Sequence, residues 1–253
     1  MVLMTLLQGV FWDVDGTLAN TEMEGHRPAF NRAFADLDLE IAWGPELYAE
    51  LLSIPGGMRR VQWYAGSRGM SLSEAQLHAI RDRKRVHYTE LARSGAVSLR
   101  PGVRRLLDQL NGAGIRQWIV TSSGLASVEA LLGSTPDLRP LFQGIVTADD
   151  VEEGKPSPQG YLCALLRSQL PLDQTLVIED SEAGLEAARA AGLRCLLTPS
   201  PWDVRLKERF SEAIAVFDHL GDVSAPATQV NGPPCREGMV TLEYLQTFGS
   251  NAG

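Results

Sequence analysis

The sequence predicts an α/β fold in which a parallel sheet is interrupted, after its first strand, by an all-helical segment. From Pro101 onward, short apolar runs of strand length alternate with segments whose apolar residues recur at helical spacing. This alternation is typical of a parallel sheet covered by helices on both faces. Residues 20–97 show helical spacing without a strand signal. We therefore expect an α/β core domain formed by residues 1–19 and 98–253, and a helical domain formed by residues 20–97.

The first strand is predicted by the run from Leu6 to Trp12, in which only Gln8 and Gly9 are not hydrophobic. A nearly continuous apolar run of this length favours a strand buried on both faces. The run ends in two carboxylates one residue apart, Asp13 and Asp15. Carboxylates at the end of a buried strand are desolvated and repel each other, so this position requires a cation or bound protons.

The other elements follow from periodicity and from Gly, Pro and Ser breaks. In the helical domain, helices are expected over Glu22–Leu37, Pro45–Leu52, Met58–Arg68 and Leu72–Ser94. In the core we expect a helix over Val103–Leu110, a strand over Ile115–Val120, a helix over Leu125–Leu132, a strand over Gly144–Thr147, a helix over Pro158–Leu170, a strand over Leu176–Ile178, a helix over Ser181–Ala191 and a strand over Leu193–Leu197. The Pro/Gly-rich segment Ser224–Pro234 is expected to be a surface loop, and Met239–Phe248 a short element of either type.

Composition limits the class of protein. With 253 residues, of which 44% are hydrophobic, the chain can bury a substantial core. No uncharged apolar run approaches the roughly 20 residues of a membrane span, and no basic leader precedes the Asp13 motif, so we expect a cytoplasmic protein. The net charge of −8 argues against nucleic acid or an anionic membrane as a partner. The three cysteines are far apart and form neither a disulfide framework nor a zinc motif.

Polar groups follow four of the predicted strands. They are Asp13 and Asp15 after the first, Thr121-Ser122-Ser123 after the second, Lys155 after the third, and Glu179-Asp180 after the fourth. Each has an ordinary interpretation of its own: an Asp-Gly turn, a helix cap, a loop lysine, and acids favoured by a helix dipole. Because the carboxyl ends of parallel strands meet at one edge of a sheet, we expect all four groups to form one site.

This ordered set resembles the motifs of the haloacid dehalogenase superfamily: Asp-x-Asp-Gly-Thr, a strand-end Ser or Thr, a Lys before Pro, and an acidic pair. The resemblance implies that Asp13 attacks phosphorus to form an aspartyl phosphate, and that Asp15 acts as general acid and then general base. It also implies a Mg²⁺ cofactor bound by Asp13, the backbone carbonyl of Asp15 and Asp180, with Glu179 holding a metal-bound water. Only oxygen ligands are offered, which suits Mg²⁺.

Three further core residues are expected to contact the phosphoryl group, and Lys155 is expected to supply positive charge to the site. Thr121 and the backbone amides near Ser122 would bind the non-bridging phosphoryl oxygens. Ser123 completes this predicted group. A phosphate dianion resists attack by an anion, so charge compensation of this kind is what such a site requires.

The helical segment after Asp15 is similar to the cap of the β-phosphoglucomutase-like branch of this superfamily. Within that branch, His26-Arg27-Pro28-Ala29-Phe30-Asn31, the Gly56-Gly57 turn and Leu99-Arg100-Pro101-Gly102 resemble xylulose-1,5-bisphosphate phosphatases. The resemblance implies that substrate is contacted by cap residues, for which the candidates are His26, Gly56, Gly57, Arg59, Arg60 and Lys84. The alternatives are an ordinary helix histidine for His26, a simple tight turn for the glycines and a solvated charged face for the arginines.

Three functions remain open at this point. A phosphatase releases phosphate from a sugar mono- or bisphosphate, a phosphosugar mutase returns the phosphoryl group to another hydroxyl, and a non-catalytic scaffold does neither. The complete set of core motifs argues against the scaffold. We expect a Mg²⁺-dependent sugar-phosphate phosphatase whose partner is a small molecule rather than nucleic acid or a membrane, and a monomer is compatible with the sequence.

Overall fold

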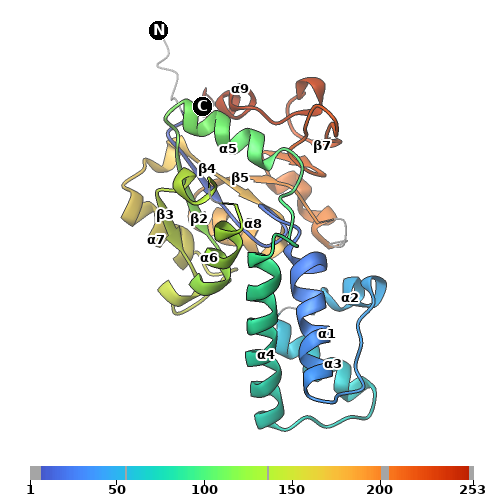
Figure 1. The fold of residues 1–253 in the computed structure, drawn as a ribbon. Coiled ribbons are helices and arrows are strands. Elements are labelled where there is room, and N and C mark those ends of the chain that lie inside the picture. The colour runs from blue at the N-terminus through green and yellow to red at the C-terminus, as the bar shows by residue number, and fades with distance from the viewer. Residues whose placement is uncertain (1–6, 55, 136, 201–204, 251–253) are drawn as a thin grey trace.

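The computed structural model describes residues 7–54, 56–135, 137–200 and 205–250. A sheet flanked by helices forms the core, and a bundle of helices, the cap, projects from one end of it (Figure 1). Leu6, where the first strand was expected to begin, lies outside the described residues. Among the described residues, no helix is both long and apolar enough to cross a bilayer.

The core contains a seven-stranded sheet with the strand order β3-β2-β1-β4-β5-β6-β7. The strands are β1 Gly9–Trp12, β2 Arg116–Val120, β3 Gly144–Val146, β4 Thr175–Glu179, β5 Arg194–Leu197, β6 Ala215–Phe217 and β7 Gln229–Asn231. The first six run parallel, which confirms the predicted class, and β7 pairs antiparallel with β6. Strand β6 has no counterpart among the elements expected from the sequence, and the expectation of a loop at Ser224–Pro234 is wrong for the residues of β7.

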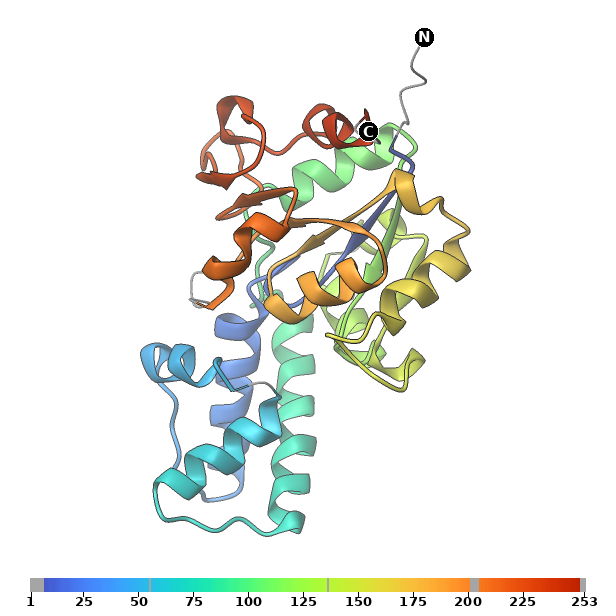
Figure 2. The same cartoon turned by 180° about the vertical axis from the view of Figure 1, so that it is seen from behind.

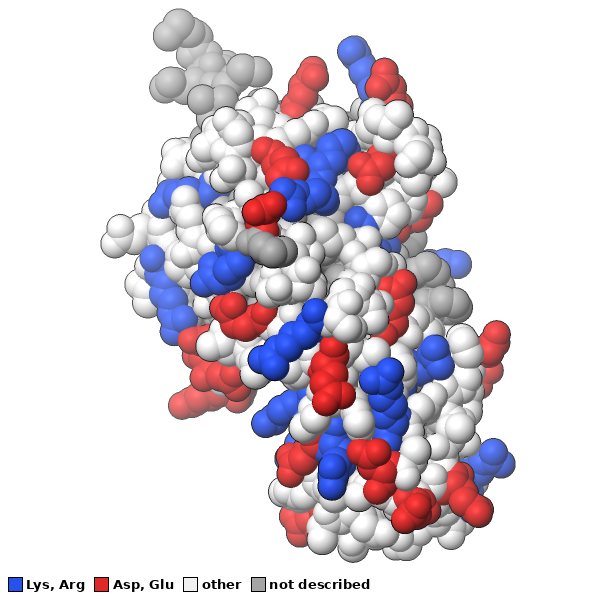
Figure 3. Space-filling view, in the orientation of Figure 1, with Lys and Arg blue, Asp and Glu red and all other residues white. Residues whose placement is uncertain are grey.

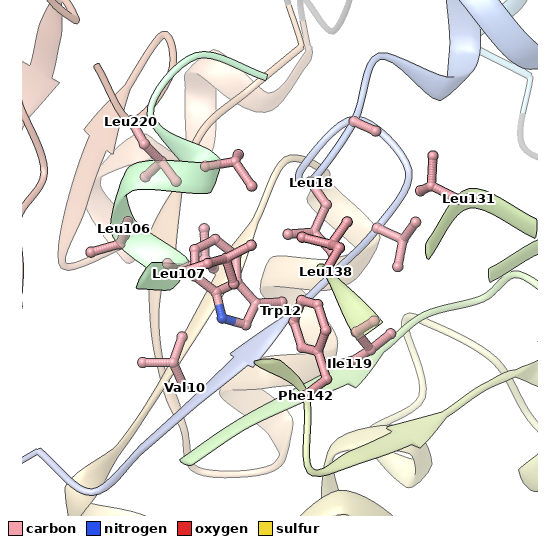
Figure 4. Packing of buried hydrophobic residues seen from close by; sticks show 14 of the residues in the cluster. Val10, Trp12, Leu18, Leu106, Leu107, Ile119, Leu131, Leu138, Phe142 and Leu220 are labelled. Carbon is pink, nitrogen blue, oxygen red and sulfur yellow. The ribbon is translucent and has the colours of Figure 1, made fainter. Parts of the chain in front are cut away.

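Burial explains why β1 is almost entirely apolar. Val10 and Trp12 lie in the cluster on one face of the sheet, whereas Phe11 lies in the cluster on the other. Figure 4 shows Trp12 among the leucines that cover the first face. The indole Nε1 of Trp12 donates to Oε1 of Gln117 at 3.1 Å, so the one polar atom of this buried ring is paired. The strand that positions Asp13 is therefore held from both sides.

Helices cover both faces of the sheet (Figures 1 and 2). The core helices are α5 Val103–Gly112, α6 Leu125–Gly133, α7 Gln159–Ser168, α8 Glu182–Ala190 and α9 Leu242–Gln246. Helices α5, α6 and α9 pack on the face of Trp12, and α7 and α8 pack on the face of Phe11. Short 3₁₀ turns span Arg139–Leu141, Ala148–Asp150, Leu172–Gln174, Arg205–Glu212, Arg236–Gly238 and Thr247–Ser250. Both faces of the sheet are thus buried, as a parallel sheet requires.

The cap has its own aromatic core. It consists of a π-helix at Thr21–His26 followed by α1 Arg27–Asp36, α2 Pro45–Leu51, α3 Gly57–Ser67 and α4 Glu74–Arg93. Phe30, Phe34, Tyr48 and Tyr64 surround Trp43, with ring centroids 4.9–5.8 Å from it. This separate cluster stabilises the cap independently of the sheet.

The chain crosses between core and cap twice, and the two crossings are hydrogen-bonded to each other. The backbone N–H of Asn20 donates to the carbonyl of Ser98 at 3.0 Å. The N–H and the hydroxyl of Ser98 both donate to Oε2 of Glu24, at 2.7 and 2.8 Å. Two residues further along, the N–H of Arg100 donates to the carbonyl of Leu18 at 3.0 Å. The two crossings therefore form one connected strap.

Charge is distributed evenly on the face shown in Figure 3, where basic and acidic side chains alternate over both core and cap. Mixed charge of this kind keeps a surface solvated without marking a binding patch. On this face, charge alone therefore marks no binding surface.

Candidate active site

The predicted core residues gather at the carboxyl end of the sheet. Strand β1 lies between β2 and β4, so the strand order reverses at β1, and ligands of such sheets bind beyond the strand ends at this point. Asp13 directly follows β1, Thr121 directly follows β2, and Glu179 is the last residue of β4. The cap joins the core at the same end (Figure 1). The site therefore lies where core and cap meet.

Lys155 links two carboxylates. Its buried ammonium lies 2.6 Å from Oδ1 of Asp13 and 2.6 Å from Oε1 of Glu179, and it donates to the carbonyl of Val120 at 2.9 Å. Burial alone would lower the pKa of Lys155, but the charges of Asp13 and Glu179 outweigh it and raise that pKa above its usual range. Lys155 is therefore a fixed positive charge beside Asp13.

Three carboxylates form a cluster that could hold a cation. Asp13, Glu179 and Asp180 each offer one oxygen, and these oxygens lie within 4.8 Å of one another. Burial and the charge of Glu179 raise the pKa of Asp13 to about 7, although Lys155 opposes the shift. Burial, followed by the charges of Asp13 and Glu179, also raises the pKa of Asp180 well above its usual range. A hard divalent cation would relieve this repulsion, and an all-oxygen donor set fits Mg²⁺.

Two glycines allow the backbone to approach these carboxylates. Gly16 has a φ of +83°, and a Cβ on it would overlap the carboxylate of Asp180. A Cβ on Gly184, in the first turn of α8, would overlap the carboxylate of Glu179. Both positions therefore require glycine, the first for its conformation as well.

The carboxylate of Glu179 already has four protein donors. Oε1 accepts from Lys155 and, at 2.8 Å, from the hydroxyl of Tyr161. Oε2 accepts from the N–H of Asp180 at 3.1 Å and from the hydroxyl of Ser181 at 3.2 Å. A carboxylate has about four acceptor positions, so in this arrangement Glu179 is oriented entirely by the protein.

Asp15 is held by the cap. Its Oδ1 lies 3.1 Å from Nε2 of His26, and Nδ1 of His26 lies 3.0 Å from Nζ of Lys84. A lysine ammonium can only donate, so Nδ1 accepts and Nε2 carries the hydrogen that is donated to Asp15. Burial acts to raise the pKa of Asp15, but hydrogen bonds from His26 and Ser123 lower it well below its usual range.

Aromatic rings support this chain of contacts. The ring of His26 stacks on Tyr88 with a centroid distance of 4.4 Å. Nζ of Lys84 lies 5.1 Å from the centroid of Tyr88 and 5.4 Å from that of Phe30. Burial lowers the pKa of Lys84, while the charges of Asp15 and Glu22 oppose the shift. Cation–π contacts of this kind stabilise a desolvated ammonium.

The residues after β2 differ in their contacts. The hydroxyl of Ser123 donates to Oδ2 of Asp15, whereas the sequence analysis expected it to contact substrate. Oγ1 of Thr121 accepts from the N–H of Ser123 at 3.0 Å, so it orients this turn. Ser122 is exposed. The turn thus presents Ser122 outward and uses Ser123 to hold Asp15.

The two cap arginines point in different directions. Arg59 is exposed, whereas Arg60 is buried and donates to the carbonyl of Leu51 at 2.9 Å and to the hydroxyl of Tyr48 at 3.0 Å. Neighbouring helix residues point about 100° apart, which explains the difference. Before them, Gly56 has a φ of +87°, and a Cβ on Gly57 would lie 2.9 Å from Phe30.

Sequence reasoning missed several polar side chains at this junction. The hydroxyl of Tyr48 donates to Oε2 of Glu22 at 2.6 Å and accepts from Arg60, so these three side chains are connected by hydrogen bonds. Tyr88 and Tyr161 were missed as well. Glu22 and Tyr48 are 26 residues apart, so no local spacing predicts their contact. In the sequence, tyrosines at helical spacing resemble ordinary core residues.

Comparison with known proteins assigns the chain to a family. Residues 7–192 match the haloacid dehalogenase-like hydrolase family. Protein CbbY of Rhodobacter capsulatus is 40% identical over 225 residues, which covers 88% of this chain and 96% of that protein. Hexitol phosphatase A of Escherichia coli is 29% identical over 229 residues, which covers 89% of this chain and 96% of that protein.

A solved structure is also similar. It is a mutant of CbbY from Rhodobacter sphaeroides in complex with xylulose-(1,5)bisphosphate, with 34% identity and a TM-score of 0.75, and the match covers 86% of this chain and 96% of that one. The family match, the similarity to CbbY and the carboxylate cluster at the strand ends lead to one conclusion. The chain belongs to the haloacid dehalogenase-like hydrolase family.

Proposed function

We propose that this chain is a Mg²⁺-dependent phosphatase that dephosphorylates a sugar bisphosphate, such as xylulose 1,5-bisphosphate, through an aspartyl phosphate on Asp13. The observation that carries the proposal is the division of the two aspartates between different partners. Asp13 is paired with the core residue Lys155, whereas Asp15 is paired with the cap residue His26. Two carboxylates in different environments can perform different steps of one reaction.

In the first step, an oxygen of Asp13 attacks phosphorus and the bond from phosphorus to the sugar oxygen breaks. Protonated Asp15 donates its proton to the departing oxygen. In the second step, water attacks phosphorus, the bond from phosphorus to the Asp13 oxygen breaks and inorganic phosphate is released, while ionised Asp15 takes a proton from that water. Asp15 then carries the proton for the next cycle. The contact with His26 lowers the pKa of Asp15, so it favours the ionised form that the second step needs, whereas the first step requires Asp15 to hold a proton against this shift.

The core supplies the charge that a phosphate dianion requires. Asp13, the carbonyl of Asp15 and Asp180 would hold Mg²⁺, and a metal-bound water would replace one of the four protein donors that Glu179 has in this structure. When bound, Mg²⁺ supplies positive charge to the phosphoryl oxygens. Lys155 adds a second fixed positive charge beside Asp13, and Thr121 with the amides near Ser122 faces the remaining oxygens.

The cap would receive the rest of the substrate. A second phosphate needs a cationic partner outside the core, and Lys84 is a half-buried lysine that reaches His26 at the junction. Arg60 is already bonded to the hydroxyl of Tyr48, and Arg59 is exposed. The complex of CbbY from Rhodobacter sphaeroides with xylulose-(1,5)bisphosphate supports a bisphosphate as the substrate class.

A screen of phosphate release from sugar mono- and bisphosphates in the presence of Mg²⁺ tests this function. We expect the highest kcat/KM for a ketose bisphosphate and no release by Asp13→Asn. Isomerised hexose phosphate formed from β-glucose 1-phosphate, with little free phosphate, would identify a mutase instead. Release from no sugar phosphate by a folded, Mg²⁺-loaded chain would refute the proposal.

Lys84→Ala tests what the cap recognises. Charge-assisted contacts to phosphate are strong, so kcat/KM for xylulose 1,5-bisphosphate should fall more than kcat/KM for a small monophosphate that does not reach the cap. Some loss is expected with both substrates, because Lys84 also contacts His26. Exposed Arg85→Ala on the same helix is the control and should change neither value. An unchanged preference in Lys84→Ala would contradict the assignment.

A further inference from the structure

Arg100 belongs to the segment Leu99-Arg100-Pro101-Gly102, to which the proposed reaction assigns no role. The residue lies at the second crossing between cap and core, and its side chain is buried, with 6% of the residue exposed. A buried arginine is costly unless its donors are all satisfied. Its partners therefore indicate what it does.

The guanidinium of Arg100 donates to backbone carbonyls on separate segments. Nη1 donates to the carbonyl of Gly16, to the carbonyl of Thr198 and, at 3.3 Å, to the hydroxyl of Thr198. Nη2 donates to the carbonyl of Pro199 at 3.2 Å and to that of Asp218. One planar cation thus connects the loop after β1 with the ends of β5 and β6.

The two residues that accept hydrogen bonds from Nη1, Gly16 and Thr198, adjoin the segments that carry the proposed metal ligands. Gly16 directly follows Asp15, and its backbone packs against the carboxylate of Asp180. The N–H of Thr198 donates to the carbonyl of Glu179, the residue before Asp180, at 2.7 Å. Nη1 therefore bridges the loop that carries the carbonyl of Asp15 and the strand end that carries the carboxylate of Asp180.

We propose that Arg100 is a positioning residue that sets the separation between the backbone carbonyl of Asp15 and the carboxylate of Asp180, and thereby determines the affinity of the site for a divalent cation. Arginine suits this task better than lysine, because its planar fork fixes several acceptors at once. Its charge also acts on Asp180 through the protein interior. This inference rests on the proposed cation site but not on the identity of the substrate.

A purely structural role predicts a different outcome, and Arg105 provides the comparison. Its guanidinium also donates to backbone carbonyls, those of Leu220 at 3.0 Å, Gly221 at 2.7 Å and Val240 at 3.0 Å. These acceptors belong to the C-terminal part of the core, and none adjoins a proposed metal ligand. Arg105→Lys thus removes a similar set of hydrogen bonds to backbone carbonyls without affecting the neighbours of the proposed metal ligands.

The test is Mn²⁺ binding to the full chain, measured by electron paramagnetic resonance without substrate and well below the melting temperature. We expect Arg100→Lys to weaken Mn²⁺ binding by roughly 10-fold, because residues that orient metal ligands typically contribute 10–100-fold to affinity. Arg105→Lys should bind Mn²⁺ as the unmodified chain does, although both variants lower the Tm. The Mg²⁺ concentration that half-saturates phosphate release should rise in parallel for Arg100→Lys only.

The outcomes are distinct. Unchanged Mn²⁺ affinity in Arg100→Lys, or an equal loss in Arg105→Lys, would overturn the positioning role. If the unmodified chain bound no Mn²⁺, the proposed cation site itself would be wrong. If Arg100→Lys did not fold, Thr198→Val would decide, since it removes the hydroxyl that accepts from Nη1 at 3.3 Å and donates to the carbonyl of Glu179 at 3.4 Å, while the carbonyl of Thr198 stays in place. That variant should show a smaller loss of Mn²⁺ affinity, and no loss would refute the inference.

Discussion

Binding of Mg²⁺ to the metal-free protein should become tighter with rising pH and should release protons. Burial and the charge of Glu179 raise the pKa of Asp13 to about 7, and a cation binds only the ionised carboxylate. With that pKa, about one-tenth of Asp13 is ionised at pH 6 and about nine-tenths at pH 8. Asp13 alone therefore predicts about a tenfold gain in apparent affinity between these values, and the raised pKa of Asp180 adds to it.

Isothermal titration calorimetry at pH 6, 7 and 8, in two buffers of different ionisation enthalpy, measures both quantities. At pH 6, each Mg²⁺ bound should displace close to one proton from Asp13 and a further fraction from Asp180. At pH 8 the contribution of Asp13 should be small. Asp13→Asn should release about one proton fewer at pH 6. Equal affinity at pH 6 and pH 8, without proton release, would refute the reasoning.

The raised pKa of Asp13 also predicts how the stability of the metal-free protein changes with pH. Folding raises the pKa of Asp13 from 3.8 to about 7, so the folded state binds this proton more tightly than the unfolded state does. Without metal, the stability contributed by protonated Asp13 is complete below pH 4 and is lost as the pH rises to about 7. Mg²⁺ removes this loss, so its effect on Tm should be larger at pH 8 than at pH 6.

Three further predictions concern the core. Asp13→Asn should abolish formation of a phosphoenzyme, whereas Asp15→Asn should reduce kcat by about 10²–10⁴-fold; a beryllium fluoride analogue bonded to Asp15 in a crystal would reverse these roles. Gly184→Ala should destabilise the fold by roughly 1–3 kcal/mol in urea unfolding, because its Cβ would overlap the carboxylate of Glu179; Gly133→Ala, with open space at its Cβ, should not, and equal effects would contradict the packing argument. Excess EDTA should stop phosphate release and added Mg²⁺ should restore it; full activity in EDTA would exclude the metal.

The regular part of the fold could be predicted because hydrophobic periodicity is local. Strand β4 was expected at Leu176–Ile178 and spans Thr175–Glu179, and α3 was expected at Met58–Arg68 and spans Gly57–Ser67. Strands β6 and β7 have only three residues each. The exposed or half-buried residues of β7 form a strand through pairing with β6, and pairing with a distant segment leaves no periodic signal.

The core of the site could be predicted for a topological reason, whereas the cap could not. The ends of parallel strands meet wherever the strands themselves form, so Asp13, Lys155 and Glu179 could be brought together from their order alone. Cap contacts depend on the rotation of each helix about its own axis. Two neighbouring residues can differ completely in exposure, as exposed Arg59 and buried Arg60 do. That rotation is set by tertiary packing.

The strap at the two crossings has a mechanical consequence. Ser98 is bonded to both Asn20 and Glu24. The two linkers are therefore tied together and would act as a single hinge between cap and core. When the cap rotates about one hinge, the displacement of each cap residue grows with its distance from that hinge. His26 lies near the first crossing and would move little, whereas the loop between α3 and α4, at the end of the cap away from the core (Figure 1), would move further. Rotation of the cap about this hinge would admit a bulky substrate while the contact between His26 and Asp15, close to the hinge, stays almost unchanged.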